Sequence, residues 1–377
     1  MMRALSAVRA VLASWAGRVR AAGTLRPILA ALKRRQAGGP SWVVTGHLRT
    51  LNDVLVSSVA PVGRPALALL KRPTTDAGER AIRRQEVILR ELRRQPGLDG
   101  WTRAVPSVLA SGQAGGRSFL VEKMLPGVSA DKLLRNGGDQ QAVITAAEAA
   151  IDPLHRGTGM TWRLDEQLLG TLIDEPLERL RPAVTGRSKL AAAETALEPL
   201  RGELRAGLTG RTVRTGWVHG DLCPGNLLVA ADGSGPAGLV DWEQSQPVGL
   251  PELDRLQLLL TTRMAVRRQE LGEVVTDLLR DESWEEAERS LTEGIASNGS
   301  APAIPTRTWL LLAWLHHVAG NVGKSERYAR SRVWVRRNVD PVLAFLPVPA
   351  PAASSGVRPA RRCASVARLE LSSASAT

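Results

Sequence analysis

The chain of 377 residues is long enough to bury a large core divided between two domains or lobes. Its two cysteines, Cys223 and Cys363, exclude a disulfide framework and favour a reducing, cytoplasmic location. The net charge of +13 lies mainly at the two ends, and no apolar run approaches the roughly 20 residues that a membrane-spanning helix needs.

The two ends differ in composition from the rest of the chain. Residues 1–40 hold eight Arg or Lys and no acid, and residues 349–377 carry a net charge of +3, which leaves about +2 for the middle. We interpret residues 1–40 as a flexible extension rich in Ala and Arg. A helix lying on an anionic membrane and an organelle transit peptide remain open alternatives. Residues 349–377, rich in Ala, Ser, Pro and Arg, should be disordered. The middle shows no basic stripe with aromatic partners, so we expect no nucleic-acid partner.

Between residues 41 and 124 the pattern predicts five strands and one helix. Short apolar and β-branched runs predict strands at 41–45, 54–59, 65–70, 107–111 and 117–124. The helix is predicted at 76–94, where charged residues alternate with apolar ones at helical spacing. Lys71 directly follows the third strand.

From Leu125 onward the chain is predicted to be mainly helical. Helical patterns occur at 130–135, 140–155, 174–180, 190–208 and, after an interruption, between 250 and 345. The interruption at 217–243 reads as two short apolar strands joined by a tight turn. No internal repeat is present.

Asp221, Asn226 and Asp241 lie on the rims of these two short strands. Residues 218–229 read Val-His-Gly-Asp-Leu-Cys-Pro-Gly-Asn-Leu-Leu-Val, and Asp241 follows in Gly-Leu-Val-Asp-Trp-Glu. A carboxylate, an amide five residues later and a second carboxylate fifteen residues beyond suit phosphoryl transfer from a metal nucleotide. Asp221 would orient and deprotonate an attacking hydroxyl, while Asn226 and Asp241 would hold Mg²⁺ against the phosphates of ATP or another nucleoside triphosphate.

This segment resembles the aminoglycoside phosphotransferase and choline kinase families, relatives of the protein kinases. They share His-Gly-Asp-x-x-x-x-Asn followed by Asp-Trp or Asp-Phe. The resemblance implies an α+β, two-lobed, protein-kinase-like fold. Its N-lobe, residues 41–124, would hold a five-stranded antiparallel sheet, and residues 125–348 would form a larger, mostly helical C-lobe. The resemblance covers roughly residues 41–345, and its motif is specific only at residues 217–243.

The same resemblance assigns the nucleotide site. Lys71 would grip the α- and β-phosphates and pair with a glutamate of the following helix. We choose Glu86, although periodicity leaves Glu79 and Glu91 open. Residues 122–127 would cross between the lobes, so that backbone groups near Glu122 and Met124 hold adenine and apolar neighbours sandwich it. Gly46 would begin a phosphate-covering loop with a single glycine.

Two features of the sequence indicate which class of acceptor the protein uses, namely Gly220 and the short segment between Asp241 and Pro251. Gly220 stands where protein kinases have an arginine that couples to an activation segment, and about ten residues leave no room for a peptide platform. We therefore expect a small-molecule hydroxyl as acceptor: an aminoglycoside, an amino-alcohol or a sugar-like compound. The alternative is a kinase-like nucleotide-binding regulatory module tethered by the basic ends. The acids available for a pocket that binds polycations are Glu252, Glu282, Glu285 and Glu286, amid many arginines.

Other polar residues receive structural interpretations. Asp254 should brace the catalytic turn or cap a helix, and His155 and His219 should brace loops. A zinc site from His219 and its neighbours is rejected on geometry. The run Gly320-Asn-Val-Gly-Lys-Ser looks like a phosphate-binding loop, but its spacing is two residues short and it follows a helical pattern. We expect a helix break with a solvated Lys324.

Overall fold

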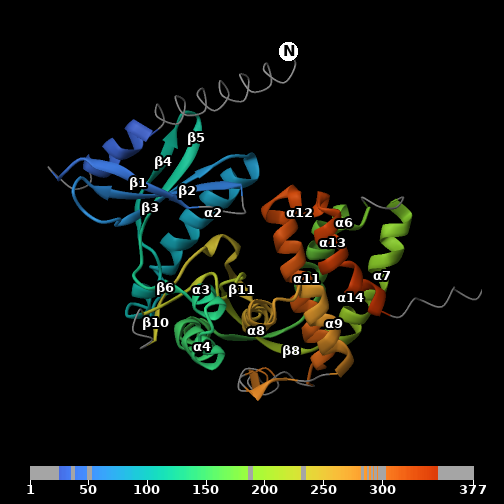
Figure 1. Cartoon of the computed structure of the whole chain (residues 1–377). Coiled ribbons are helices and arrows are strands. Elements are labelled where there is room, and N and C mark those ends of the chain that lie inside the picture. Colours follow the sequence, from blue (N-terminus) through green and yellow to red (C-terminus); the bar gives the residue numbers. More distant parts are fainter. Residues whose placement is uncertain are drawn as a thin grey trace, which may run out of the picture. The chain divides into compact units, whose positions relative to one another are not determined.

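An antiparallel sheet of five strands forms the N-terminal lobe (Figure 1). In the computed structural model its order is β1–β2–β3–β5–β4, and the bounds are β1 Trp42–Leu48, β2 Val54–Pro61, β3 Ala68–Pro73, β4 Val108–Ala114 and β5 Arg117–Lys123. The structure describes residues 25–34, 39–48, 53–185, 190–230, 235–281, 284–286, 288–289, 292, 295 and 303–346. The five strands of this sheet confirm the five strands predicted from the sequence.

Helix α2 (Asp76–Leu92) packs on one face of this sheet. Thr75 caps the helix by accepting a hydrogen bond from Gly78 N at 3.2 Å, and acidic residues in its first turn favour the helix dipole. Ile82 and Leu89 of α2 join Leu120 of β5 in the main hydrophobic core.

A second helical segment, residues 25–34, packs on the other face. Ile28 and Leu32 are 0% and 2% exposed, and they cluster with Trp42, Leu70 and other residues of that face. The interpretation of residues 1–40 as a flexible extension is therefore wrong for residues 25–34. Burying two aliphatic side chains favours folding by about 1.5–3 kcal/mol each, which fixes the segment. The rest of the proposed extension, and the proposed tail at 349–377, lie outside the described residues, apart from residues 39–40.

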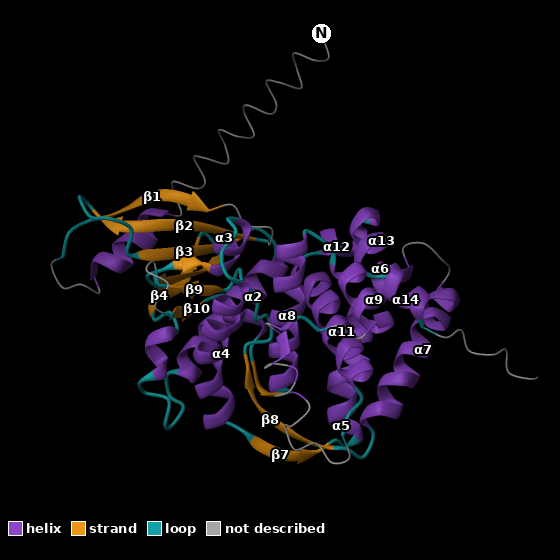
Figure 2. Cartoon of the chain, turned by 60° about the horizontal axis from the view of Figure 1, so that its bottom comes forward, coloured by secondary structure: helices purple, strands orange, loops and turns teal. Residues whose placement is uncertain are grey.

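Helices dominate from residue 130 onward (Figure 2). Their bounds are α3 Ala130–Arg135, α4 Gln140–Gly157, α5 Glu166–Leu169, α6 Glu175–Thr185, α7 Leu190–Leu208, α8 Pro251–Arg267, α9 Leu271–Asp281, α11 Thr306–Lys324, α12 Glu326–Arg330, α13 Arg332–Asn338 and α14 Asp340–Phe345. Within the described part of the chain, no helix is long and apolar enough to cross a membrane. The helical patterns read from the sequence are confirmed.

Two small antiparallel sheets interrupt these helices. One has the order β10–β9–β6, with β6 Val128–Ser129, β9 Leu227–Val229 and β10 Pro236–Leu239; the other has the order β11–β8–β7, with β7 Met160–Arg163, β8 Thr212–Val218 and β11 Gln246–Gly249. The predicted catalytic turn lies between β8 and β9, and Asp241 follows β10. Both lobes together match the expected two-lobed α+β fold.

Tryptophan and aliphatic side chains fill the core because the chain has only two Phe and one Tyr. Trp242 and Trp314 are among the largest fully buried side chains. Each donates its indole N–H to a backbone carbonyl, Trp242 to Leu239 O at 2.9 Å and Trp314 to Asn338 O at 2.8 Å. These bonds satisfy the polar end of each ring, which would otherwise be costly to bury.

Candidate functional site

Asp221 lies in the turn between β8 and β9, surrounded by three donors. Gln257 Nε2 of α8 donates to Asp221 Oδ1 at 2.7 Å, Asn226 Nδ2 donates to Oδ2 at 3.1 Å, and Lys324 Nζ pairs with Oδ2. Burial acts to raise the pKa of Asp221, but the Lys324 ammonium outweighs burial and holds the pKa below its ordinary value. Asp221 is therefore an ionised carboxylate in a partly buried site, as a base requires.

Asp254, near the start of α8, braces this turn. Its buried carboxylate accepts hydrogen bonds from His219 N at 2.7 Å, from Gly220 N at 2.8 Å and from the ring of His155 at 3.0 Å. The His219 ring donates Nε2–H to Val240 O at 2.9 Å and accepts from Asp221 N through Nδ1. These contacts match the bracing roles expected for all three residues.

Gly220 is required by the conformation and surroundings of the backbone. Its φ is +75°, and a Cβ there would lie 2.3 Å from Gln244 O. Any other residue would be strained and would push the catalytic turn away from the segment that follows Asp241. The close approach therefore gives this position a structural reason to be glycine.

Asp241 adopts a left-handed conformation, with φ 63° and ψ 59°. Non-glycine residues rarely do so, and such strain concentrates at functional sites. Its Oδ1 lies 2.6 Å from Lys71 Nζ of β3. Burial acts to raise the pKa of Asp241, but Lys71 and then Lys324 outweigh it, so the pKa lies below its usual value.

Lys71 is 5% exposed and is bound by residues other than the predicted Glu86. Its Nζ pairs with Glu122 Oε1 at 3.0 Å and donates to Gln85 Oε1 at 3.1 Å, and Gln85 Nε2 donates to Glu122 Oε2 at 2.8 Å. Burial acts to lower the pKa of Lys71, but Asp241 and Glu122 outweigh it and raise the pKa. Lys71 is therefore a fixed cation at the back of the cleft.

The predicted Lys71–Glu86 pair is wrong. Glu86 Oε1 instead binds Arg90 Nη2 at 2.9 Å and Ser111 Oγ, on the next face of α2. One residue along a helix turns the side chain by about 100°, so Gln85 faces the sheet and Glu86 does not. The two other glutamates left open also lie elsewhere, because Glu79 binds Arg83 and Ser118 N and Glu91 is exposed.

The predicted adenine-binding segment differs in part. The Glu122 side chain turns inward to Lys71, as described above. Met124 is 43% exposed, and its N–H donates to Leu67 O at 2.9 Å. A role for Met124 beside adenine remains a prediction. Residues 49–52 of the proposed phosphate-covering loop lie outside the described residues.

Lys324 and Glu243 are site residues that the sequence did not reveal. Gly320–Lys324 forms the last turn of α11, which supports rejecting the phosphate-binding loop, but Lys324 is not solvated: its side chain is 14% exposed and paired with Asp221. Glu243 is buried close to Asp241. Its burial, and to a smaller extent the nearby Asp241 carboxylate, raise the pKa of Glu243 to about 7. The motif Asp-Trp-Glu contained a signal for Glu243, whereas the local pattern around Lys324 suggested only a phosphate-binding loop, which the structure does not form.

A cavity of about 410 Å³ brings Lys71, Asp241 and Lys324 to one place. It lies between α2, β2 and the segments that carry Asp241 and Lys324. Other basic side chains also line it, namely Arg80, Arg84 and Arg179. A basic cleft beside ionised carboxylates suits a polyphosphate held with a divalent cation.

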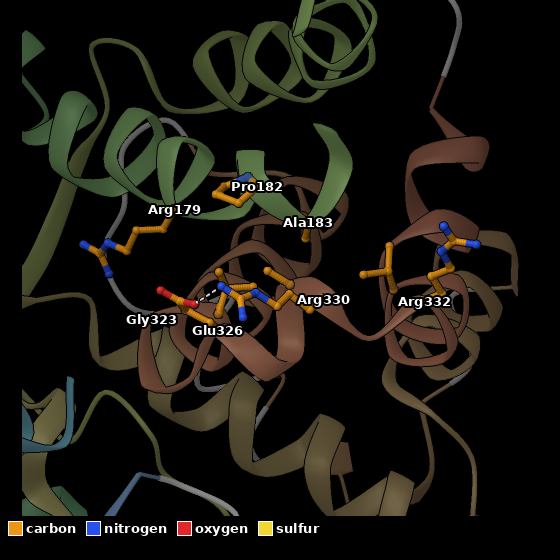
Figure 3. Close-up of a pocket in the computed structure, with 10 residues that line it drawn as sticks. Arg179, Pro182, Ala183, Gly323, Glu326, Arg330 and Arg332 are labelled. Atoms are coloured by element: carbon orange, nitrogen blue, oxygen red, sulfur yellow. Dashed lines mark ion pairs between the residues drawn. The ribbon is translucent and has the colours of Figure 1, made fainter. Parts of the chain in front are cut away.

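A second cavity, of about 730 Å³, lies among α6, α11, α12 and α13 (Figure 3). It shares Arg179 and Gly323 with the first cavity. Arg179 and Arg332 lie on opposite sides of it, and the Glu326–Arg330 ion pair lies between them. Glu326 is the single carboxylate of its lining. Of the four acids noted in the sequence, Glu252, Glu285 and Glu286 line neither cavity, and Glu282 lies outside the described residues.

Comparisons with known proteins place the chain among related sequences and folds. The sequence profile of the phosphotransferase enzyme family matches residues 63–293. A candidate fructosamine-3-kinase from Haemophilus somnus 129PT is similar in structure, with a TM-score of 0.51, 13% identity, and coverage of 87% of this chain and 100% of that chain. An aminoglycoside phosphotransferase from Streptomyces rimosus bound to ADP and streptomycin gives a TM-score of 0.45, with 16% identity and coverage of 80% and 99%.

No curated protein matches the chain by sequence. The family profile, however, spans more than half of the chain and includes Lys71, Asp221, Asn226 and Asp241. The structural likeness supports the kinase-like fold independently. The resemblance read from the sequence is thus confirmed: the chain belongs to the phosphotransferase enzyme family and is an enzyme with a kinase-like fold.

Proposed function

We propose that the protein transfers the γ-phosphoryl group of ATP, or of another nucleoside triphosphate, to a hydroxyl of a small molecule. The observation that carries the proposal is a basic cleft lined by Lys71, Asp241 and Lys324, with the ionised Asp221 paired to Lys324 beside it. A binding module has no need of a buried ionised carboxylate beside its phosphate site. A phosphotransferase needs that carboxylate to accept the proton of the attacking hydroxyl.

The side chains divide the chemistry among them. Lys71 holds the α- and β-phosphates, and its own position is fixed by Glu122 and Gln85. Asp221 accepts the hydroxyl proton and aims the hydroxyl oxygen at phosphorus. Bringing the two reactants together in the right orientation supplies much of the rate.

Asp241 and Asn226 would hold Mg²⁺. The donor set fits, because Asn226 directs its Nδ2 to Asp221 and keeps an amide oxygen for a cation, and the Asp241 carboxylate is 39% exposed toward the cleft. Mg²⁺ is usually bound in proteins by one or two such oxygen ligands plus the substrate phosphates, whose charge it neutralises.

The second cavity supports an acceptor site next to the cleft. It shares the lining residues Arg179 and Gly323 with the cleft, and Gly323 directly precedes Lys324, which touches Asp221. Its volume is that of a metabolite site. Three arginines and one glutamate line it, so its charge disfavours a polycation such as streptomycin and favours a neutral or anionic hydroxyl compound.

The test is ATP turnover with Mg²⁺ against hydroxylated metabolites of positive, zero and negative charge. Asp221→Asn should lower turnover about 10²–10⁴-fold, because the amide keeps the shape but cannot accept the proton. Asp281→Asn, at an exposed position of α9, is the matched control and should match the wild type. Nucleotide binding without turnover on any acceptor would indicate a regulatory module. Full activity of Asp221→Asn would assign the base elsewhere.

A further inference from the structure

Lys324 ends α11 where the base and the nucleotide cleft meet. Its Nζ pairs with Asp221 Oδ2, and its side chain lines the cavity that also contains Lys71 and Asp241. The side chains of Lys324 and Asp221 are 14% and 15% exposed. Lys324 therefore contacts the proposed base directly and also faces the cleft in which the nucleotide phosphates would lie.

The local electrostatics keep Lys324 charged. Burial alone would lower its pKa, but the carboxylates of Asp221 and then Glu243 outweigh burial and raise the pKa. Lys324 is also among the cations that lower the pKa of Asp241. The charge of Lys324 therefore acts on Asp221, which would hold the attacking hydroxyl, and on Asp241, which would hold the metal nucleotide.

The residue after Lys324 holds this end of α11 in place. Ser325 is 2% exposed, and its Oγ donates to Asp53 Oδ1 at 3.1 Å, just before β2. Asp53 Oδ2 accepts in turn from Thr75 Oγ1, the N-cap of α2, at 2.9 Å. The N-terminal lobe and α11 are thus joined beside Lys324, which fixes its backbone relative to the cleft.

We propose that Lys324 is a catalytic residue that contacts the transferring phosphoryl group; this rests on the proposed phosphotransferase function. As the bond between the acceptor oxygen and phosphorus forms, the bond from phosphorus to the β-phosphate oxygen breaks and its electron pair leaves with the nucleoside diphosphate. The hydroxyl proton passes to Asp221. Lys324 donates to a non-bridging oxygen of the phosphoryl group in transit, where charge must be balanced.

A simpler role would be to position Asp221 alone. The two roles differ in the Asp221→Asn background, where no carboxylate remains for Lys324 to hold. They also differ in the affinity for the Mg²⁺ complex of ADP with aluminium fluoride, which imitates the phosphoryl group in transit and needs no identified acceptor. A residue that only positions the base would leave that affinity unchanged.

The experiment measures, by isothermal titration calorimetry, the affinity of the full chain for Mg·ADP and for Mg·ADP with aluminium fluoride. Lys324→Met should weaken binding of the fluoride complex about 10²–10³-fold, as loss of one charge-stabilising donor does, and leave binding of Mg·ADP little changed. The loss should persist in the Asp221→Asn background. Lys324→Arg should keep most of the affinity, and Lys132→Met, at an exposed position of α3, is the matched control.

The possible outcomes are distinct. Wild-type affinity for the fluoride complex in Lys324→Met, or a loss that disappears in the Asp221→Asn background, would overturn the proposal and leave Lys324 as a positioning residue. Because Lys324→Met leaves Asp221 without its cation, the thermal unfolding of each variant should be measured alongside its titration. If Lys324→Met is unfolded, the Asp221→Asn pair of proteins decides alone. A wild-type protein that neither binds the fluoride complex more tightly than Mg·ADP nor turns over ATP would refute the proposed function itself.

Discussion

Replacing Asp254 should disconnect the catalytic turn from α8. Asp254→Ala removes a carboxylate that accepts from His219 N, Gly220 N and the His155 ring, all within 3.0 Å. The carboxylate is 1% exposed, so water cannot replace it without rearrangement. Hydrogen bonds to charged groups contribute about 1.5–3 kcal/mol each, and a buried donor left without a partner costs about 1–3 kcal/mol. Because these two estimates overlap, we expect a loss of about 3–5 kcal/mol in the free energy of unfolding.

The effect on catalysis should exceed the effect on nucleotide binding. Asp221 directly follows Gly220, so a turn that shifts by about 1 Å would misplace the base, which can cost about 100-fold in rate. Asp254→Asn keeps one acceptor oxygen, turns an N–H toward one of the backbone donors, and should fall between wild type and Asp254→Ala.

The assays are urea unfolding followed by tryptophan fluorescence, and hydrogen exchange of the peptide that covers residues 217–226. Exchange should accelerate in Asp254→Ala even where the rest of the chain stays protected. Asp281→Ala, an exposed position of α9, is the control. An Asp254→Ala protein within about 1 kcal/mol of wild type, with unchanged exchange at residues 217–226, would refute the bracing argument.

Two further predictions concern the metal site and the N-terminal helix. Asp241→Ala should weaken binding of the nucleotide with Mg²⁺ but have a smaller effect without it, because the lost group is the proposed metal ligand. Titrating ATP with and without Mg²⁺ tests this, and equal affinity losses in both conditions would count against the assignment. A chain starting at residue 39 should be less stable than one starting at residue 25 by about 3–6 kcal/mol, since it lacks the buried Ile28 and Leu32. Equal unfolding curves for the two chains would show that this helix contributes nothing to the fold.

Most of the fold and the central motif could be predicted from the sequence. Strand and helix patterns are local, and so is the turn that carries Asp221 and Asn226. The helix at 25–34 was missed although Ile28 and Leu32 stand four residues apart, because an end rich in arginine and lacking acids looked unstructured. The spacing of apolar residues, rather than composition, held the signal.

The place of Lys324 in the site could not be found in this way. This lysine contacts Asp221 across 103 residues of sequence, and only the packing of α11 brings the two together. Gln257 is similar, since it reaches Asp221 from α8. A short-range pattern describes the residues on one element, whereas these contacts depend on how separate helices meet at the cleft.

The prediction that Glu86 pairs with Lys71 failed for a physical reason, and the partners that Lys71 has instead carry a structural consequence. Glu86 was chosen because the family places its glutamate just before the apolar face of this helix, whereas periodicity alone left the rotation of α2 undecided. The next residue, Val87, is 54% exposed, so this side of the helix does not face the core. In the structure Gln85 takes the place of Glu86 beside Lys71, and the charge comes from Glu122 on β5, which pairs directly with β3 in the sheet. Two residues on neighbouring strands of one sheet stay in register whether or not a helix moves. The ion pair that fixes Lys71 therefore does not depend on a carboxylate from α2, and at this ion pair displacing that helix would remove only the two hydrogen bonds that Gln85 makes with Lys71 and Glu122.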